Sequence, residues 1–314
     1  MTLPASLAAR LKLPLIVAPM FLVSGPEMVI AACRAGAIGA FPAANARGPE
    51  VLDAWLTQIR RELGPEDAPF CPNIIMRSPD IAEEVACLLR HKTEIVITSV
   101  GSPKPIVKPL HDAGCLVLSD VASMHHAERA IEAGVDGLIL LTAGAGGQTG
   151  WANGFAFTRA VRAIFDGVVV LAGGISDGTA LFAAEVLGAD LGYMGTQFIA
   201  TPESMADPAY REMLVESSLD DIMLTRAFTG LETNMLRPSL IRAGLDPETL
   251  QPLAAEAAAD AMFGAEAVAA PRRWQDIWSA GHSVAGVTEI APVAEKIARV
   301  QAEYAAARAA VRER

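Results

Sequence analysis

Aromatic residues are scarce in this chain. They make up 5% of its 314 residues, although 52% of the residues are hydrophobic. The buried core must therefore consist mainly of Ala, Val, Ile and Leu side chains, which is typical of a parallel sheet covered by helices on both faces. The length suffices for one α/β barrel with a modest insertion, and two separate domains of ordinary size are also compatible with it.

Basic runs and membrane-spanning stretches are lacking as well. The formal net charge of -11 repels a phosphate backbone, and no Lys/Arg cluster offsets it locally, so we expect no nucleic-acid partner. No apolar run is long enough to cross a bilayer, and we expect no membrane partner. The apolar run 13–23 follows Arg10 and Lys12 and imitates a secretory signal, but Pro14 and Pro19 interrupt it. A β-strand ending at Pro19 explains this run better.

Paired cysteines are also absent. The four cysteines form no CxxC motif, and the five histidines show no metal-ligand spacing beside them. We therefore expect no metal site, reduced thiols and a cytoplasmic location. These residues are Cys33, Cys71, Cys87, Cys115, His91, His111, His125, His126 and His282.

Short apolar runs bounded by turn residues recur along the chain, with helical segments between them. This alternation is typical of repeated βα units around a parallel sheet. We count eight runs, which predicts a (β/α)₈ TIM barrel. The expected strands are Leu13–Ala18, Ala37–Phe41, Phe70–Met76, Glu94–Ser99, Cys115–Ser119, Gly137–Leu141, Val168–Ala172 and Leu191–Met194.

Glycines punctuate the ends of several expected helices. Each stands where a left-handed C-terminal cap is needed before the next strand. The repetition favours eight units of one barrel over a doubly wound open sheet. The helices include Pro26–Ala35, Ile81–Arg90, Ala122–Ala133 and Gly178–Leu187, and the capping glycines are Gly36, Gly114, Gly134 and Gly188.

The alternation of expected strands and helices ends after the eighth expected strand. Residues 206–285 are rich in Ala and Glu and are predicted to form a mostly helical insertion over the active site. The barrel itself is assigned to residues 1–205 and 286–314. Its last helix is expected within Pro292–Arg314.

Glycine-rich turns follow the sixth, seventh and eighth strands. Functional residues of such barrels gather at the carboxyl ends of the strands. At the last two strands, Gly173, Gly174 and Gly195 would let backbone N–H groups approach an anion closely, and the helix that follows adds a favourable dipole. We interpret these turns as a phosphate site, although Ser176 or Asp177 could simply cap the next helix.

These residues together resemble the nitronate monooxygenases, a family of FMN-dependent barrels related to the flavin-dependent enoyl-ACP reductases. The resemblance extends over most of the chain. It rests on seven sites along the chain: Ala18-Pro19-Met20, Asn73, Gly101-Ser102-Pro103, Ala145 to Gly150, the two phosphate turns Ala172 to Ile175 and Met194 to Thr196, and Ser279 to Ser283.

The resemblance implies which residues would bind FMN. The phosphate would lie against the turns of the seventh and eighth strands, and the isoalloxazine ring along the first and third strands and the glycine loop. The implied cofactor-binding residues are Ala18, Pro19, Met20, Asn73, Gly146, Gly147, Ala172, Gly173, Gly174, Gly195 and Thr196.

Two departures from the family pattern bear on the chemistry. Gln148 stands where the family has a catalytic histidine, and Ser119-Asp120 replaces its lysine or histidine at the fifth strand. Glutamine cannot take up a proton near neutral pH, but it can polarise a carbonyl or nitro group. The catalytic candidates are therefore Gln148, Asp120 and His282. Asp120 could instead cap the next helix, and His282 could be a packing or surface residue.

The expected function is an FMN-dependent oxidoreductase that oxidises a small organic substrate such as an alkyl nitronate. NADH or NADPH is a candidate reductant. An NAD(P)H-dependent ene or enoyl reductase and an NAD(P)H:quinone reductase are alternatives on the same scaffold. A flavin-binding protein without turnover is an alternative of another class, and so is a sugar-phosphate barrel, although the strand ends carry no catalytic Lys or Glu pair. A homodimer is compatible with the sequence.

Overall fold

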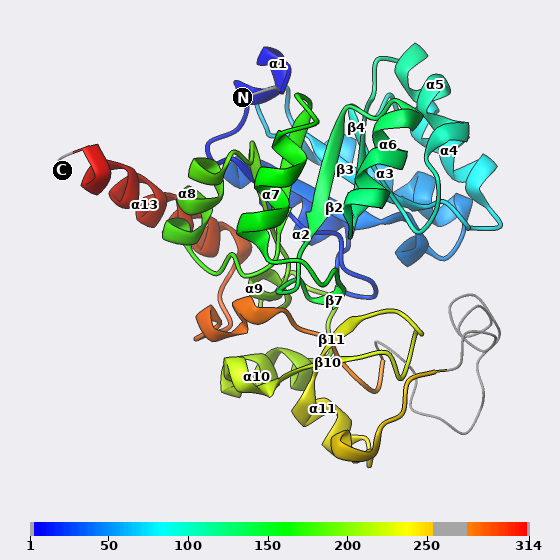
Figure 1. Cartoon of the computed structure of the whole chain (residues 1–314). Coiled ribbons are helices and arrows are strands. Elements are labelled where there is room, and N and C mark those ends of the chain that lie inside the picture. The colour runs from blue at the N-terminus through cyan, green and yellow to red at the C-terminus, as the bar shows by residue number, and fades with distance from the viewer. Residues whose placement is uncertain (1–2, 254–274, 313–314) are drawn as a thin grey trace.

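Eight parallel strands close into a barrel in the computed structural model of the chain, which describes residues 3–253 and 275–312 (Figure 1). The predicted fold class is confirmed, and every expected strand coincides with an observed one apart from its end residues. The strands, in their order around the barrel, are β1 Leu15–Val17, β2 Ile38–Pro42, β3 Phe70–Ile75, β4 Ile95–Ser99, β5 Leu116–Val121, β6 Gly137–Leu141, β8 Val168–Ala172 and β9 Leu191–Met194.

Helices surround the barrel, and α13 packs between α8 and α2 to complete the ring. Gly36, Gly134 and Gly188 adopt the left-handed conformation at the ends of α2, α6 and α8, as the sequence predicts. The barrel helices are α2 Pro26–Ala35, α3 Pro49–Glu62, α4 Ile81–Arg90, α5 Lys104–Asp112, α6 Met124–Ala133, α7 Gly154–Arg162, α8 Gly178–Leu187 and α13 Val293–Arg312.

The barrel interior is filled by aliphatic side chains from alternate strand positions. Cys71, Ile97 and Leu118 belong to this buried cluster. Because side chains alternate along a strand, the residues two positions further on also face inward, one layer closer to the carboxyl ends. In β3, β4 and β5 these residues are Asn73, Ser99 and Asp120. On these three strands the layer beneath the mouth of the barrel is therefore polar, although the layers below it are apolar.

The segment after β9 differs from the expected mostly helical insertion, which is not confirmed. Two of its strands pair in antiparallel fashion, and β11 also pairs with β7, which lies in the loop after β6. Figure 1 shows this three-stranded sheet beside the carboxyl end of the barrel. The elements are β7 Gly147–Gln148, α9 Thr196–Ile199, α10 Pro208–Glu216, β10 Ile222–Thr225, β11 Thr233–Leu236, α11 Arg237–Arg242 and the 3-10 turns Leu219–Asp221, Pro247–Thr249 and His282–Gly286. Two further short elements, α1 Ala5–Ala8 and the 3-10 turn Ala43–Ala46, precede α3.

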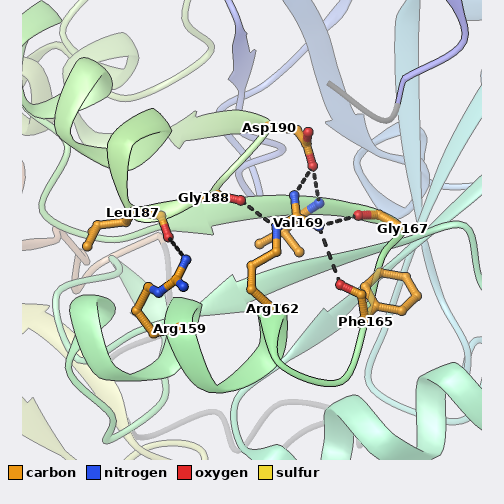
Figure 2. Close-up of polar contacts among 8 residues, drawn as sticks. All are labelled: Arg159, Arg162, Phe165, Gly167, Val169, Leu187, Gly188 and Asp190. Atoms are coloured by element: carbon orange, nitrogen blue, oxygen red, sulfur yellow. Dashed lines mark hydrogen bonds and ion pairs between the residues drawn. The ribbon is translucent and has the colours of Figure 1, made fainter.

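A polar network joins helices α7 and α8 to the amino ends of β8 and β9 (Figure 2). The Arg162 guanidinium donates to the carbonyls of Gly188 at 2.5 Å and Gly167 at 2.6 Å and pairs with Asp190. Asp190 also accepts the Val169 amide at 2.9 Å. One largely buried side chain therefore connects four successive elements at the end of the barrel opposite the glycine turns.

The four cysteines are free thiols, and all are buried. Burial raises the pKa of Cys33 and Cys115 to about 12, so both remain protonated at neutral pH. Among the described helices, none is long and apolar enough to cross a bilayer.

Candidate active site

The turn after β8 combines two left-handed glycines with open space. Gly173 has φ +115° and Gly174 φ +74°. A Cβ at Gly173 would lie 2.4 Å from Thr142 Oγ1, so this glycine is required by its contact with the loop after β6. A Cβ at Gly174 would meet no atom within 4 Å. The N–H of Gly174 donates to no acceptor among the described residues, so an amide at the end of β8 remains available.

The turn after β9 lies against the first strand. A Cβ at Gly195 would be 3.3 Å from Met20 Sδ and 3.5 Å from Ala18 Cβ, and the Ala18 amide donates to Met194 O at 2.9 Å. The Gly195 amide also has no acceptor within residues 3–253 and 275–312. Thr196 is buried, and its hydroxyl accepts the Gly281 amide at 2.9 Å. The structure thus brings the expected first-strand motif and the eighth-strand turn together.

The glycine loop after β6 is held by the inserted sheet. Gly147 and Gln148 form β7, where Gln148 is opposite Thr233 and Gly147 opposite Asn234. The Asn234 side chain, 1% exposed, donates to Ala143 O at 2.8 Å and Ala145 O at 2.7 Å. The backbone of Gln148 is therefore fixed, whereas its half-buried side-chain amide is bound to no other described residue and can face a ligand.

His282 lies against the same loop. Its amide donates to Gly144 O at 3.0 Å, and its Nδ1 lies 3.2 Å from the position that a Cβ of Gly144 would take. Gly146 and Gly281 approach so closely that a Cβ on Gly146 would be 2.7 Å from Gly281 N. The imidazole is exposed. The structure therefore places His282 at the rim of the barrel mouth, next to the loop that carries Gln148.

Asn73 faces the barrel interior from β3. It is 6% exposed, and its amide donates to Ser99 Oγ on the neighbouring strand at 3.2 Å. Ala172, the last residue of β8, is also buried, and its carbonyl accepts the Thr142 amide at 3.1 Å. Both residues lie at the floor of the mouth. Pro19 and Met20 are half-buried above it.

Asp120 belongs to β5 and does not cap the following helix. Ser123 does so, because its hydroxyl accepts the His126 amide. Burial raises the pKa of Asp120 to about 7, and its buried Oδ1 has no hydrogen-bond partner among the described residues. Burial and the Asp120 charge together hold the pKa of Tyr193 well above its usual value. A carboxyl group that exchanges a proton near neutral pH thus lies inside the barrel.

Other caps and contacts complete this geometry. Asp177 caps α8 by accepting the Ala180 amide at 2.8 Å, as the simpler sequence interpretation allowed. Asn45 donates to Met20 O at 3.0 Å and accepts the Leu22 amide at 2.8 Å, which fixes the loop after β1. The sequence analysis missed Asn45, Asn234, Ser99 and Tyr193. Of these four residues, only Ser99 and Tyr193 could have been identified from the sequence, because each is a polar residue near the end of an expected strand.

Comparison with known proteins agrees with this geometry. The family model for nitronate monooxygenase matches residues 77–303. The chain belongs to the nitronate monooxygenase family. The resemblance inferred from the sequence is therefore confirmed.

Curated relatives of this nitronate monooxygenase family member carry different names. A nitronate monooxygenase of Paraburkholderia phytofirmans is 27% identical, with 92% of each chain covered. A hydroxy-methyl-oxo-octahydroindene-carboxyl-CoA dehydrogenase of Mycobacterium tuberculosis is 27% identical over 73% of this chain. The match spans 64% of the length of that dehydrogenase and of its Rhodococcus jostii counterpart.

Solved structures show the same barrel. FabK from Thermotoga maritima has a TM-score of 0.83 and 28% identity, with 97% of this chain and 96% of that chain covered. A nitroalkane oxidase from Streptomyces ansochromogenes has a TM-score of 0.82 at 24% identity, with 98% and 100% covered. The second likeness concerns the fold alone.

Proposed function

We propose that this chain is an FMN-dependent oxidoreductase that oxidises a small organic substrate such as an alkyl nitronate. The observation that carries the proposal is the pair of available amides at Gly174 and Gly195. Both follow neighbouring strands, β8 and β9, at the carboxyl end of the barrel. Membership of the nitronate monooxygenase family supports a flavin as the bound group.

The residues at these turns fit an FMN phosphate. An anion needs N–H donors and no obstructing side chain, and the open space beside Gly174 meets the second requirement. Gly173, Gly195 and Thr196 would complete the cradle. The flavin ring would lie toward Ala18, Pro19, Met20, Asn73 and Ala172, with Gly146 and Gly147 closing over it.

Three side chains would act on the substrate. FMN supplies the oxidation and reduction chemistry when it is bound. Gln148 would orient a nitro or carbonyl oxygen by a hydrogen bond, because its amide has no other partner among the described residues. Asp120 would hold or release a proton, because its pKa of about 7 allows both states near neutral pH. His282 at the rim would contact the outer part of the substrate.

A second candidate is a reductase of activated alkenes, with NADH or NADPH as reductant. Two observations favour it: Gln148 cannot accept a proton from a neutral nitroalkane, and buried Asp120 can donate the proton that an activated alkene takes up together with a hydride. The structural similarity to FabK also supports this second candidate. Parallel assays with an alkyl nitronate and with an α,β-unsaturated thioester would separate the two candidates. A protein that binds FMN but turns over neither would be a flavin-binding protein.

The phosphate assignment predicts a selective defect in Gly174→Ala. Gly114→Ala is a matched control, because Gly114 has φ +77° and open space around its Cβ position but lies at the amino end of β5. Both variants should lose about 1 kcal/mol of stability from backbone strain. Only Gly174→Ala should bind FMN more weakly, because its Cβ would fill the open space that the phosphate needs and so disturb hydrogen bonds to a charged group. The expected loss of affinity is about 10- to 100-fold. Equal FMN titration curves for the two variants would refute the phosphate site.

The role of Gln148 predicts a gain of function in Gln148→His. A histidine on β7 would supply the proton acceptor that the family normally has, so kcat/KM with a neutral nitroalkane should rise by about 10²-fold. Activity with the pre-formed nitronate should change little, because that substrate needs no base. Gln148→Asn, which keeps an amide without a base, is the control. A Gln148→His variant whose kcat/KM with the neutral nitroalkane stays at the wild-type value, or changes by the same factor as that with the nitronate, would contradict the assignment.

A further inference from the structure

A second cluster of ligating side chains lies far from the barrel mouth. Asp53 of α3 meets Cys87 and His91, which lie one helical turn apart at the end of α4. The carboxylate, thiol and imidazole atoms of this group all lie within 4.8 Å of one another. Because α4 leads directly into β4, the cluster is at the amino end of the barrel, opposite the glycine turns.

We propose that Asp53, Cys87 and His91 form a binding site for a divalent cation of the zinc class. One oxygen, one sulfur and one nitrogen are a ligand set typical of Zn²⁺, with a water molecule in the fourth position. The proposal revises the sequence-based expectation of no metal site. The sequence analysis found no metal-ligand spacing, and the structure adds Asp53 from another helix to Cys87 and His91.

The distances match the edges of a tetrahedral site. Zinc–ligand bonds of about 2.0–2.3 Å imply an N···O edge of about 3.3 Å and an S···O edge of about 3.5 Å. His91 Nε2 is 3.0 Å from Asp53 Oδ1, and Cys87 Sγ is 3.6 Å from the same oxygen. Two of the three edges therefore already have about the length that a tetrahedral ion requires, and the third, between Cys87 and His91, is no longer than 4.8 Å.

Burial makes the site selective. Cys87 is fully buried and the His91 side chain is 14% exposed, whereas Asp53 is 43% exposed and leaves a path for the ion. The Cys87 thiol binds a cation as the thiolate, so its proton leaves when the ion binds. A soft or borderline cation gains most from the resulting thiolate, which disfavours Mg²⁺ and Ca²⁺.

Arg90 competes with a cation for Asp53. Its guanidinium lies 3.0 Å from Asp53 Oδ1, and the side chain is 59% exposed. An exposed ion pair of this kind contributes little stability, so a divalent ion can displace it. The proposal therefore predicts opposite effects on metal affinity: removal of Arg90 should strengthen metal binding, whereas removal of a ligand should weaken it.

Titration of the purified full chain with Co²⁺ tests the site. We expect one equivalent to produce a thiolate-to-cobalt charge-transfer band in the near ultraviolet and the intense d–d bands of tetrahedral cobalt, and Zn²⁺ to abolish both. Cys87→Ser should remove the charge-transfer band, His91→Asn should weaken binding by at least about tenfold, and Arg90→Ala should strengthen it. Cys115→Ser and His111→Asn are controls, because His111 pairs with Asp136 but Cys115 does not join them in a group of close ligand atoms among the described residues.

The readout is independent of the flavin chemistry. None of these variants touches the barrel mouth, so FMN titration curves should remain those of the wild type. A cobalt spectrum without the charge-transfer band, or one unchanged in Cys87→Ser, would overturn the proposal. Weaker binding in Arg90→Ala would overturn it as well.

Discussion

At the scale of single residues, Asp120 is a carboxyl group buried inside the barrel, and burial changes its usual ionisation. A buried carboxyl with one unpartnered oxygen favours its neutral form, and its pKa is raised to about 7. The burial of this carboxyl affects both the stability of the fold and the chemistry of the site. It destabilises the fold when ionised, and it offers a transferable proton at neutral pH.

Stability should therefore depend on pH through Asp120. The unfolded chain ionises this carboxyl near its ordinary pKa of 3.8, whereas the folded chain does so only near pH 7. Between these values the unfolded state alone loses the proton, so native stability falls as pH rises and levels off above pH 7. Asp120→Asn removes this penalty and should raise the free energy of unfolding at pH 8 by about 1–3 kcal/mol, with little change at pH 4. Denaturant titrations at the two pH values measure the difference, and an equal effect at both would exclude a raised pKa.

At the scale of secondary structure, the barrel strands could be predicted and the inserted strands could not. Each barrel strand is a short apolar run bounded by turns, so its signal is local. β7 has only two residues, Gly147–Gln148, and forms because β11 lies beside it, more than 80 positions later in the sequence. Ile222–Thr225 and Thr233–Leu236 show no alternation of polar and apolar residues that would mark them as strands. A pairing created by distant segments leaves no local pattern.

The same limit applies to the site. Glycine turns at strand ends could be read from sequence because every residue involved lies within a few positions of a strand. Asn234 could not, since its role depends on where the insertion folds back. The ligand set of Asp53, Cys87 and His91 was missed for the same reason: the helix pair α3 and α4, and not the spacing of the residues, brings its members together.

Asn234 should control the glycine loop through the inserted sheet. Asn234→Ala leaves two loop carbonyls without their donor, which should cost about 1–3 kcal/mol. It should also lower kcat/KM by at least about tenfold, because β7 no longer fixes Gln148. Asn153→Ala is the control. Asn153 caps α7 by accepting the Phe155 amide, so its loss should cost about 1 kcal/mol and leave Gln148 in place. Comparable loss of activity in both variants would show that the loop is positioned by other contacts.

At the scale of the whole molecule, the barrel separates the residues that stabilise it from those proposed to react. The glycine turns, Gln148 and Asp120 lie toward the carboxyl ends of the strands, whereas the Arg162 network lies at the amino ends of β8 and β9. Parallel strands place these two sets at opposite faces of the barrel. Changes at one face should therefore leave the other intact.

Arg162→Met tests this separation. The substitution removes a largely buried cation beside Asp190, together with donors to Gly167 and Gly188, and should lower the free energy of unfolding by about 3–5 kcal/mol. Arg159→Met is the matched control. Among the described residues Arg159 donates only to Leu187 O, at 3.0 Å and from an exposed position (Figure 2), so its loss should cost less than about 1 kcal/mol. Well below the unfolding transition, both variants should bind FMN with wild-type affinity. A parallel loss of FMN affinity and stability in Arg162→Met would mean that the amino end of the barrel sets the geometry of the glycine turns.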